Sequence, residues 1–208
     1  MAKAQAVSPA EPEARRDQVL RAAEALFARG GYRGVGLREI AAQVGIRAPS
    51  LFKHFPSKHA LYNAVLCNIF GRLAEVGARL EEFVNGYIDL VATDPNVSQL
   101  LFRELMERSE VMDADTRAAA FEIYRRIDAF LEAGQRAGEF RQVDRFRFQV
   151  ALTGAILYHS LAARPYAAIL NRVAPPDRSA WKRTVLDLAR GALLAPPPLA
   201  PRRARTRR

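Results

Sequence analysis

The sequence predicts an all-α protein of about nine helices, and three observations support this fold class. Apolar residues recur at helical spacing through most of the chain, whereas the alternation typical of a half-buried strand appears nowhere. Glycine, proline and aspartate separate the periodic stretches, as they do at helix ends. Half of the 208 residues are apolar, so we expect a sizeable helical core.

The first predicted helix begins near Pro12, a residue that suits a first helical turn. Gly30 and Gly31 are expected to end it, and a glycine-rich connector follows. Residues 1–10, before the helix, are expected to be disordered. Helical spacing gives the helix one apolar face. This face consists of Val19, Ala22, Ala23, Leu26 and Phe27.

Two short helices are predicted at 37–44 and 48–54. Gly45 lies between them and permits a sharp turn, because glycine tolerates positive φ. A helix, a short turn with glycine and a second helix form the helix-turn-helix pattern. With the first helix they define a predicted domain over residues 11–57. The side chains expected to face inward are Leu37, Ile40, Ala41, Val44, Ile46, Leu51, Phe52 and Phe55.

The rest of the chain predicts a second helical domain over residues 58–195. Ser57 is the expected N-cap of its first helix, and either Asp113 or Asp115 caps a later one. A proline run ends the last helix, and residues 196–208 are expected to form a disordered, arginine-rich tail. The predicted helices cover 58–76, 78–93, 96–108, 114–137, 144–163 and 177–194.

The net charge of +10 is concentrated at the two ends of the chain. Residues 1–60 carry ten lysines and arginines against five acids, and residues 199–208 carry five arginines and no acid. The stretch between them is neutral. A basic region of this kind indicates a polyanionic partner, most often nucleic acid. The alternative is that the arginines only keep the chain soluble.

Several function classes find no support in the sequence. No apolar stretch approaches the roughly 20 residues that span a bilayer, and the N-terminus does not read as a signal peptide. We therefore expect a cytoplasmic protein. Cys67 is the single cysteine, so neither a disulfide nor a metal cluster is expected. Nucleophile-elbow, phosphate-loop and zinc-protease motifs are absent, so we expect neither an enzyme nor a cofactor.

Residues 34–62, GVGLREIAAQVGIRAPSLFKHFPSKHALY, resemble the DNA-binding signature of TetR-family regulators. The specific resemblance extends over about residues 15–66, a quarter of the chain. It implies an N-terminal DNA-binding domain followed by a helical domain that binds a small ligand and dimerises. The signature positions occur here as Ile40-Ala41, Gly45, Leu51-Phe52, His54-Phe55 and Ser57-Lys58.

The resemblance implies that the helix after Gly45 enters the major groove of double-stranded DNA. Arg47 would then reach guanine O6 and N7, which is the commonest specific contact. The alternative for Arg47, Lys53 and His54 is that they face solvent or pack on the helix pair. The expected DNA-binding residues are Arg38, Arg47, Ala48, Ser50, Lys53, His54 and Lys58.

Three departures from the family pattern concern DNA affinity. Phe52 stands where the family commonly has a tyrosine that gives its hydroxyl to a phosphate. Gly36 and Leu37 occupy positions where hydroxyl residues are usual, and Arg47 replaces a frequent serine cap. Fewer polar contacts to the DNA backbone are therefore expected, and the arginine tail is a candidate to compensate.

The resemblance also implies a pocket among the middle helices and a dimer interface on the last two. The aromatic and methionine side chains of the middle helices suit a small, mostly apolar or amphipathic ligand. The alternative is ordinary core; His159 also suits a core or interface histidine, and Arg103 and Glu104 either pair with neighbours or meet the ligand. The expected ligand residues are Phe70, Tyr87, Phe102, Met106, Phe121, Tyr124 and His159.

The last two helices are expected to pair with those of a second copy. The alternative is that their apolar side chains are buried inside one subunit. The interface residues expected on this basis are Phe148, Leu152, Leu161, Trp181, Val185 and Leu188.

The function predicted from these observations is a homodimeric, ligand-responsive transcriptional regulator. We expect a repressor that binds a palindromic operator and is released by its ligand, although activation fits the same sequence. The main alternative is a helical small-molecule-binding protein that has lost sequence-specific DNA binding. Attachment of the arginine tail to a membrane surface is a weaker alternative, so no membrane partner is expected.

Overall fold

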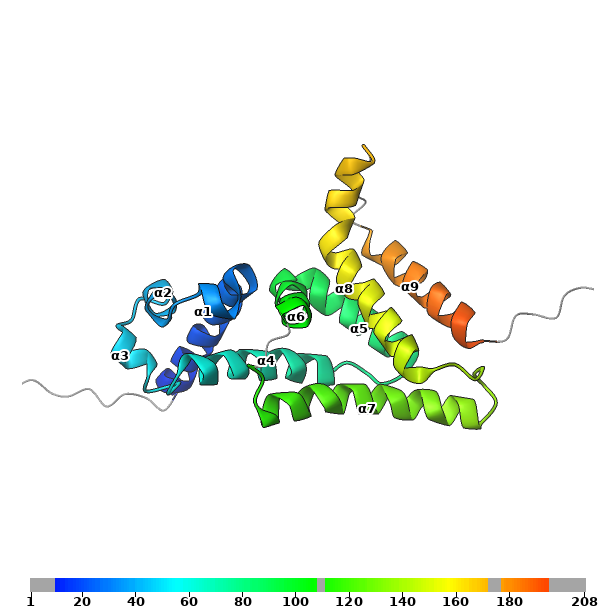
Figure 1. Cartoon of the computed structure of the whole chain (residues 1–208), viewed down its shortest axis with the longest axis horizontal. Helices are drawn as coiled ribbons and strands as arrows, with labels where there is room; N and C mark the ends of the chain where they lie inside the picture. Colours follow the sequence, from blue (N-terminus) through cyan, green and yellow to red (C-terminus); the bar gives the residue numbers. More distant parts are fainter. Residues whose placement is uncertain (1–9, 108–110, 172–176, 195–208) are drawn as a thin grey trace, which may run out of the picture.

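The computed structural model describes residues 10–107, 111–171 and 177–194, and these form nine helices and no strand (Figure 1). The predicted fold class is confirmed. The arginine-rich tail over residues 196–208 lies outside the described residues, and so do residues 1–9 of the N-terminal stretch that was expected to be disordered. The helices are α1 (Ala10–Gly34), α2 (Leu37–Gln43), α3 (Ala48–Leu51), α4 (Lys58–Ala74), α5 (Leu80–Thr93), α6 (Pro95–Glu107), α7 (Ala114–Arg136), α8 (Arg145–Ile169) and α9 (Arg178–Leu193).

Helices α1 to α3 form a small head at one end of the molecule (Figure 1). The glycine pair after Arg29 does not end α1: the helix kinks at Gly31 and resumes to Gly34. Gly45 has a φ of 68° in the turn between α2 and α3, as predicted. Helix α3 is shorter than predicted and ends at Leu51, after which the chain continues in turns.

Helix α4 leaves the head and packs against α7, so the two run side by side along the lower edge of Figure 1. Helices α5 and α6 lie between them and α8, while α8 and α9 diverge from each other like the arms of a V. Buried apolar side chains connect all of these elements in one continuous core, from Val19 in α1 to Leu193 in α9. The head and the second domain are therefore packed on each other.

The predicted helix starts are confirmed where a side chain caps the helix. Ser57 accepts a hydrogen bond from the Ala60 amide, and Asp113, not Asp115, accepts one from the Thr116 amide. Helix α8 continues past Pro165, so its predicted end at residue 163 is wrong. No helix in the described parts of the chain combines the length and the hydropathy needed to cross a lipid bilayer.

Candidate functional site

The helix-turn-helix is held by a small core under α2 and α3. Ile40 and Leu51 are completely buried, and Ala41 and Phe55 are almost completely buried. The Ile46 amide donates to the Ala41 carbonyl across the turn, which fixes the angle between the two helices. The outer faces of α2 and α3 are thereby turned to solvent.

Three basic side chains lie on this outer surface. Arg38 on α2, Arg47 in the turn and Lys53 after α3 are all exposed. Ala48, which is half-buried, lies beside them at the start of α3. Cations on the exposed face of a helix-turn-helix are positioned to meet the phosphates and base edges of a duplex.

The other predicted DNA-binding residues lie closer to the body of the head. Ser50 and His54 are half-buried. Lys58 begins α4, and its ammonium lies 4.7 Å from the centre of the Tyr32 ring, where cation and ring attract each other. Burial lowers the pKa of Lys58. Lys58 therefore helps to fix α4 against α1, in addition to any contact with DNA.

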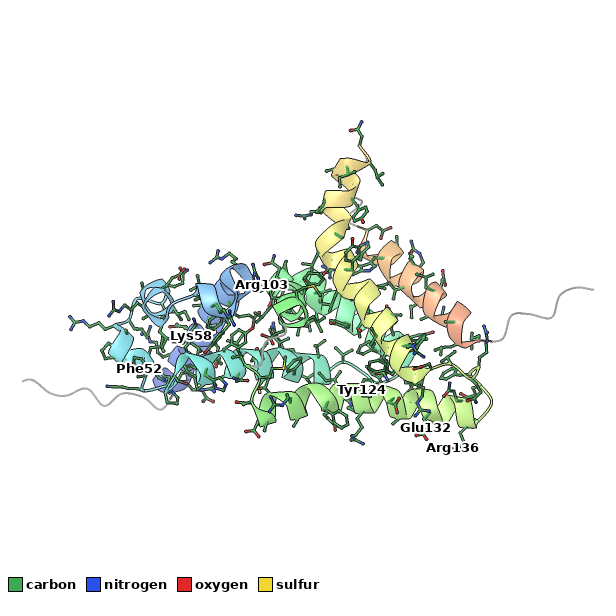
Figure 2. All side chains as sticks on the ribbon, in the orientation of Figure 1. Phe52, Lys58, Arg103, Tyr124, Glu132 and Arg136 are labelled. Carbon is green, nitrogen blue, oxygen red and sulfur yellow. The ribbon has the colours of Figure 1, made fainter. Side chains whose placement is uncertain are left out.

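Phe52 lies on the surface, which contradicts its predicted place in the core. The ring is 49% exposed, whereas Leu51 and Phe55 on either side of it are buried. With Leu37 and Pro49 it lines a shallow hollow between α2 and α3. Leu51 points into the core and Phe52, the next residue, points away from it, so Phe52 adds an apolar contact surface to the head (Figure 2).

The second domain contains a cavity of about 370 Å³ that is open to solvent on one side and is lined by residues of α4, α5, α6, α7 and α8. Phe70, Tyr87 and Tyr124 line it, as predicted. The other predicted ligand residues do not line it. The residues that do are Phe70, Leu73, Phe83, Tyr87, Leu101, Glu104, Leu105, Met112, Ala120, Ile123, Tyr124, Ile127, Gln149, Val150, Thr153 and Leu157.

The predicted ligand residues outside this lining lie on other faces of their helices. Met106 and Phe121 are more than 60% exposed, and Phe102 is half-buried. His159 stacks on Trp181 of α9, with the ring centres 4.2 Å apart. Partial burial there lowers the pKa of His159. This stack joins α8 to α9 instead of reaching the cavity.

Besides the hydroxyls of Tyr87 and Tyr124, three polar side chains interrupt the apolar lining of the cavity. Glu104 is buried and accepts a hydrogen bond from the Tyr62 hydroxyl. Thr153 donates its hydroxyl to the Gln149 carbonyl at 2.8 Å. Gln149 is 4% exposed. The sequence offered no signal for Gln149, because a single glutamine in an apolar helix has the same pattern whether it faces a cavity, solvent or a partner.

Helix α6 joins the cavity to the head through two adjacent residues. Glu104 lines the cavity and contacts Tyr62, whose ring packs edge-on against Phe27 of the head. Arg103 points the other way and donates to the carbonyls of Ala28 at 2.8 Å and Arg29 at 2.6 Å, just before the kink in α1 (Figure 2). Helix α6 therefore contacts both the cavity and the head.

A charged cluster forms a second link between the head and the rest of the chain. Arg72 of α4 donates to both carboxylate oxygens of Glu24 in α1, each at 3.0 Å, and to Asp94 at 2.7 Å. Burial raises the pKa of Glu24 to about 7, Asp94 adds to this and Arg72 opposes it. Burial alone would raise the pKa of Asp94, but its hydrogen bond from Arg72 lowers it.

This cluster predicts that stability depends on pH through Glu24. The folded protein holds the Glu24 proton up to a pKa of about 7, against an ordinary value of 4.5, so the stabilisation is present below pH 4.5 and is lost as pH rises through 7. From about pH 5 to pH 8 the free energy of unfolding should fall by about 2 kcal/mol on this account. Glu24→Gln should remove that component in urea titrations, whereas the exposed control Glu39→Gln should keep it. Equal pH profiles for wild type and Glu24→Gln would contradict the prediction.

The predicted interface residues occupy three different environments. Leu152 and Val185 are buried in the core of a single chain, which is the alternative that the sequence left open for them. Phe148, Leu161 and Trp181 are half-buried, and Leu188 is 66% exposed. Further large apolar side chains are exposed along α8 and α9. These are Phe146, Val150, Tyr158, Tyr166, Ile169, Leu170 and Leu194.

Comparison with known proteins matches both halves of the chain to one family. Residues 19–65 match the family model described as bacterial regulatory proteins, tetR family, and residues 74–160 match the model described as tetracyclin repressor-like, C-terminal domain. The first match covers the head, and the second begins at the end of α4 and extends into α8.

Among curated proteins, the chain is 36% identical over 73 residues to the HTH-type transcriptional repressor KstR2 of Mycolicibacterium smegmatis, covering 33% of this chain and 36% of that protein. It is 33% identical over 99 residues to the HTH-type transcriptional activator FasR of the same organism, covering 42% of this chain and 45% of that protein. These matches span less than half of either relative.

Among solved structures, the ketosteroid transcriptional regulator KstR2 of Mycobacterium tuberculosis aligns with a TM-score of 0.66 at 18% identity, over 88% of this chain and 96% of that one. At this identity the likeness concerns the fold alone. Taken with the two family models, which match the head and most of the second domain, the comparisons agree with the helix-turn-helix geometry: the chain belongs to the TetR family of bacterial regulatory proteins.

Proposed function

We propose that this protein is a DNA-binding transcriptional regulator that binds a palindromic operator as a homodimer and responds to a small apolar ligand. The observation that carries the proposal is the exposed basic surface of Arg38, Arg47 and Lys53 on a helix-turn-helix with a buried core. Such a surface supplies phosphate contacts and, through Arg47, a bidentate donor for guanine. Repression is the proposed sign of regulation, as in the relative KstR2, which is named a repressor.

The homodimer is supported by the apolar side chains that α8 and α9 leave exposed. Leu188 on α9 and Tyr158 on α8 are each more than half exposed. Pairing of these helices with those of a second copy would bury them and place two heads at a fixed separation. A fixed separation is what a palindromic site requires, because its half-sites are a helical turn or a multiple of one apart.

The ligand response is proposed to act by population shift. A ligand in the cavity that prefers a dimer with wrongly spaced heads lowers the affinity for the operator. A release of about 100-fold requires a preference of about 2.7 kcal/mol for that state. The contacts of α6 with Tyr62 and with the end of α1 offer a short route for this preference to reach the head.

A second candidate function is a small-molecule-binding protein that no longer reads DNA. It is favoured by Phe52, which has no hydroxyl for a phosphate, and by Gly36, which caps α2 without a side-chain hydrogen bond. Sequence-blind and weak binding to duplex DNA would support this candidate over the regulator.

The deciding experiment is footprinting and gel shift on the intergenic DNA beside the gene, over a series of salt concentrations. Wild type should protect a roughly palindromic site, and Arg47→Ala should bind it about tenfold more weakly, because one bidentate contact is lost. The matched control is Arg136→Ala, an exposed arginine paired with Glu132 at the far end of α7, which should leave binding unchanged (Figure 2). Equal binding by wild type and Arg47→Ala, without a protected site, would overturn the proposal.

A further inference from the structure

The cavity between α4 and α8 contains a buried amide that finds no acceptor. The Nε2 atom of Gln149 is shielded from solvent and has no hydrogen-bond partner among the described residues. The residue lines the cavity. A buried N–H donor without an acceptor is unfavourable, and natural proteins rarely keep one without a reason.

Two of the other polar side chains of the lining already have partners. Glu104 accepts from Tyr62, and Thr153 donates to the backbone of its own helix. Apolar and aromatic side chains make up most of the remaining wall. Gln149 therefore supplies the buried donor of the lining that lacks an acceptor. Tyr87 and Tyr124, which carry hydroxyls, also line the cavity, and the rest of the wall selects for shape and apolar surface.

The charge of the wall disfavours anionic ligands. Among the described residues that line the cavity there is no lysine, arginine or histidine, and Glu104 contributes a carboxylate. An anionic head group would be desolvated there without a counter-charge and would lie in the same small space as Glu104. The wall thus disfavours free carboxylates and phosphates.

From these observations we infer that the ligand is a neutral, largely apolar molecule carrying a carbonyl or similar oxygen, which accepts a hydrogen bond from Gln149 Nε2. The cavity volume of about 370 Å³ suits a compact molecule, near the lower end of small-molecule sites. This inference rests on the proposed ligand response and adds to it the charge and polarity of the ligand.

The test uses four compounds with the same two-ring skeleton and different functional groups. Benzophenone is a neutral ketone, diphenylmethane lacks the acceptor, diphenylacetate is an anion and benzhydrylamine is a cation. Calorimetric titration of the full chain should give the tightest binding for benzophenone, about tenfold tighter than diphenylmethane, since one hydrogen bond to a buried donor is gained. Diphenylacetate should bind more weakly than the ketone, because the described wall offers no counter-charge, and tighter binding of benzhydrylamine would show that Glu104 and not Gln149 selects the ligand.

The variant Gln149→Leu should bind both neutral compounds equally, because it keeps the shape of the wall and removes the donor. The control Gln142→Leu, an exposed glutamine outside the lining, should keep the tenfold preference. Without ligand, Gln149→Leu should unfold at the same temperature as wild type or higher, because it removes an unpaired polar group. A preference retained by Gln149→Leu, tighter binding of either charged compound, or no binding of any compound up to its solubility limit would overturn the inference.

Gel shift on the same preparations separates this inference from the proposed function. If the protein protects a palindromic site but binds benzophenone no more tightly than diphenylmethane, the inference about the ligand is wrong and the proposed function stands. If the protein prefers benzophenone to diphenylmethane but binds no specific DNA site, the proposed regulatory function is wrong and the inference about the ligand stands.

Discussion

Arg72→Met is expected to lower the free energy of unfolding by about 3 kcal/mol at pH 8. The substitution keeps most of the apolar stem and leaves Glu24 and Asp94 close together without the cation that both of them contact. Removing one partner of a buried ion pair costs about 3–5 kcal/mol. The lower end applies here, because 30% of the Arg72 side chain is exposed.

The effect of Arg72→Met should shrink in acid, which distinguishes it from a packing defect. At pH 5 Glu24 is largely protonated in the fold, so it has less need of the guanidinium. Urea unfolding at both pH values measures the difference. The control Arg125→Met breaks the exposed pair with Glu122 on α7 and should change the free energy of unfolding little at either pH. A loss from Arg72→Met that is the same at both pH values would show that the charge cluster is not its cause.

The sequence predicted most of the helices because their ends carry local chemistry. Ser57 and Asp113 each accept a hydrogen bond from the amide three residues later, and Gly45 allows the turn because its φ is positive. The buried face of α2 was also predictable, because the helical spacing of its apolar residues identifies that face. The end of α8 was misplaced: the helix continues through Pro165, although residues 164–166 are exposed and no packing there explains it.

The cavity was only partly predictable, because apolar residues surround several of its helices. On α6 the sequence predicted Phe102 and Met106, whereas Leu101 and Leu105 line the cavity. A shift of one residue turns the helix by about 100°, and the sequence alone does not decide which of the two faces borders the cavity. The bonds from Arg103 to α1 were equally invisible, since they join residues about 75 positions apart in the sequence.

The second large effect is expected from Arg103→Met, which should loosen the head without unfolding the second domain. Arg103 donates to two carbonyls at the end of the straight part of α1, and hydrogen bonds from a charged donor contribute about 1.5–3 kcal/mol each. Losing both should make the amides of α1, α2 and α3 that exchange by local opening exchange about 100-fold faster. Amides of α7 and α9 should change little, because they do not contact this arginine.

Hydrogen exchange followed by mass spectrometry resolves this difference helix by helix. The matched control is Arg126→Met, which removes a similar bond from a guanidinium to the Ala74 carbonyl at the end of α4. It should speed exchange at the C-terminal end of α4 and leave the head unaffected. Unchanged exchange in the head of Arg103→Met would mean that the shared core of α1 and α4 alone positions the head. In that case α6 could not transmit the state of the cavity through its bonds to α1, and any response to a ligand would have to travel along α4.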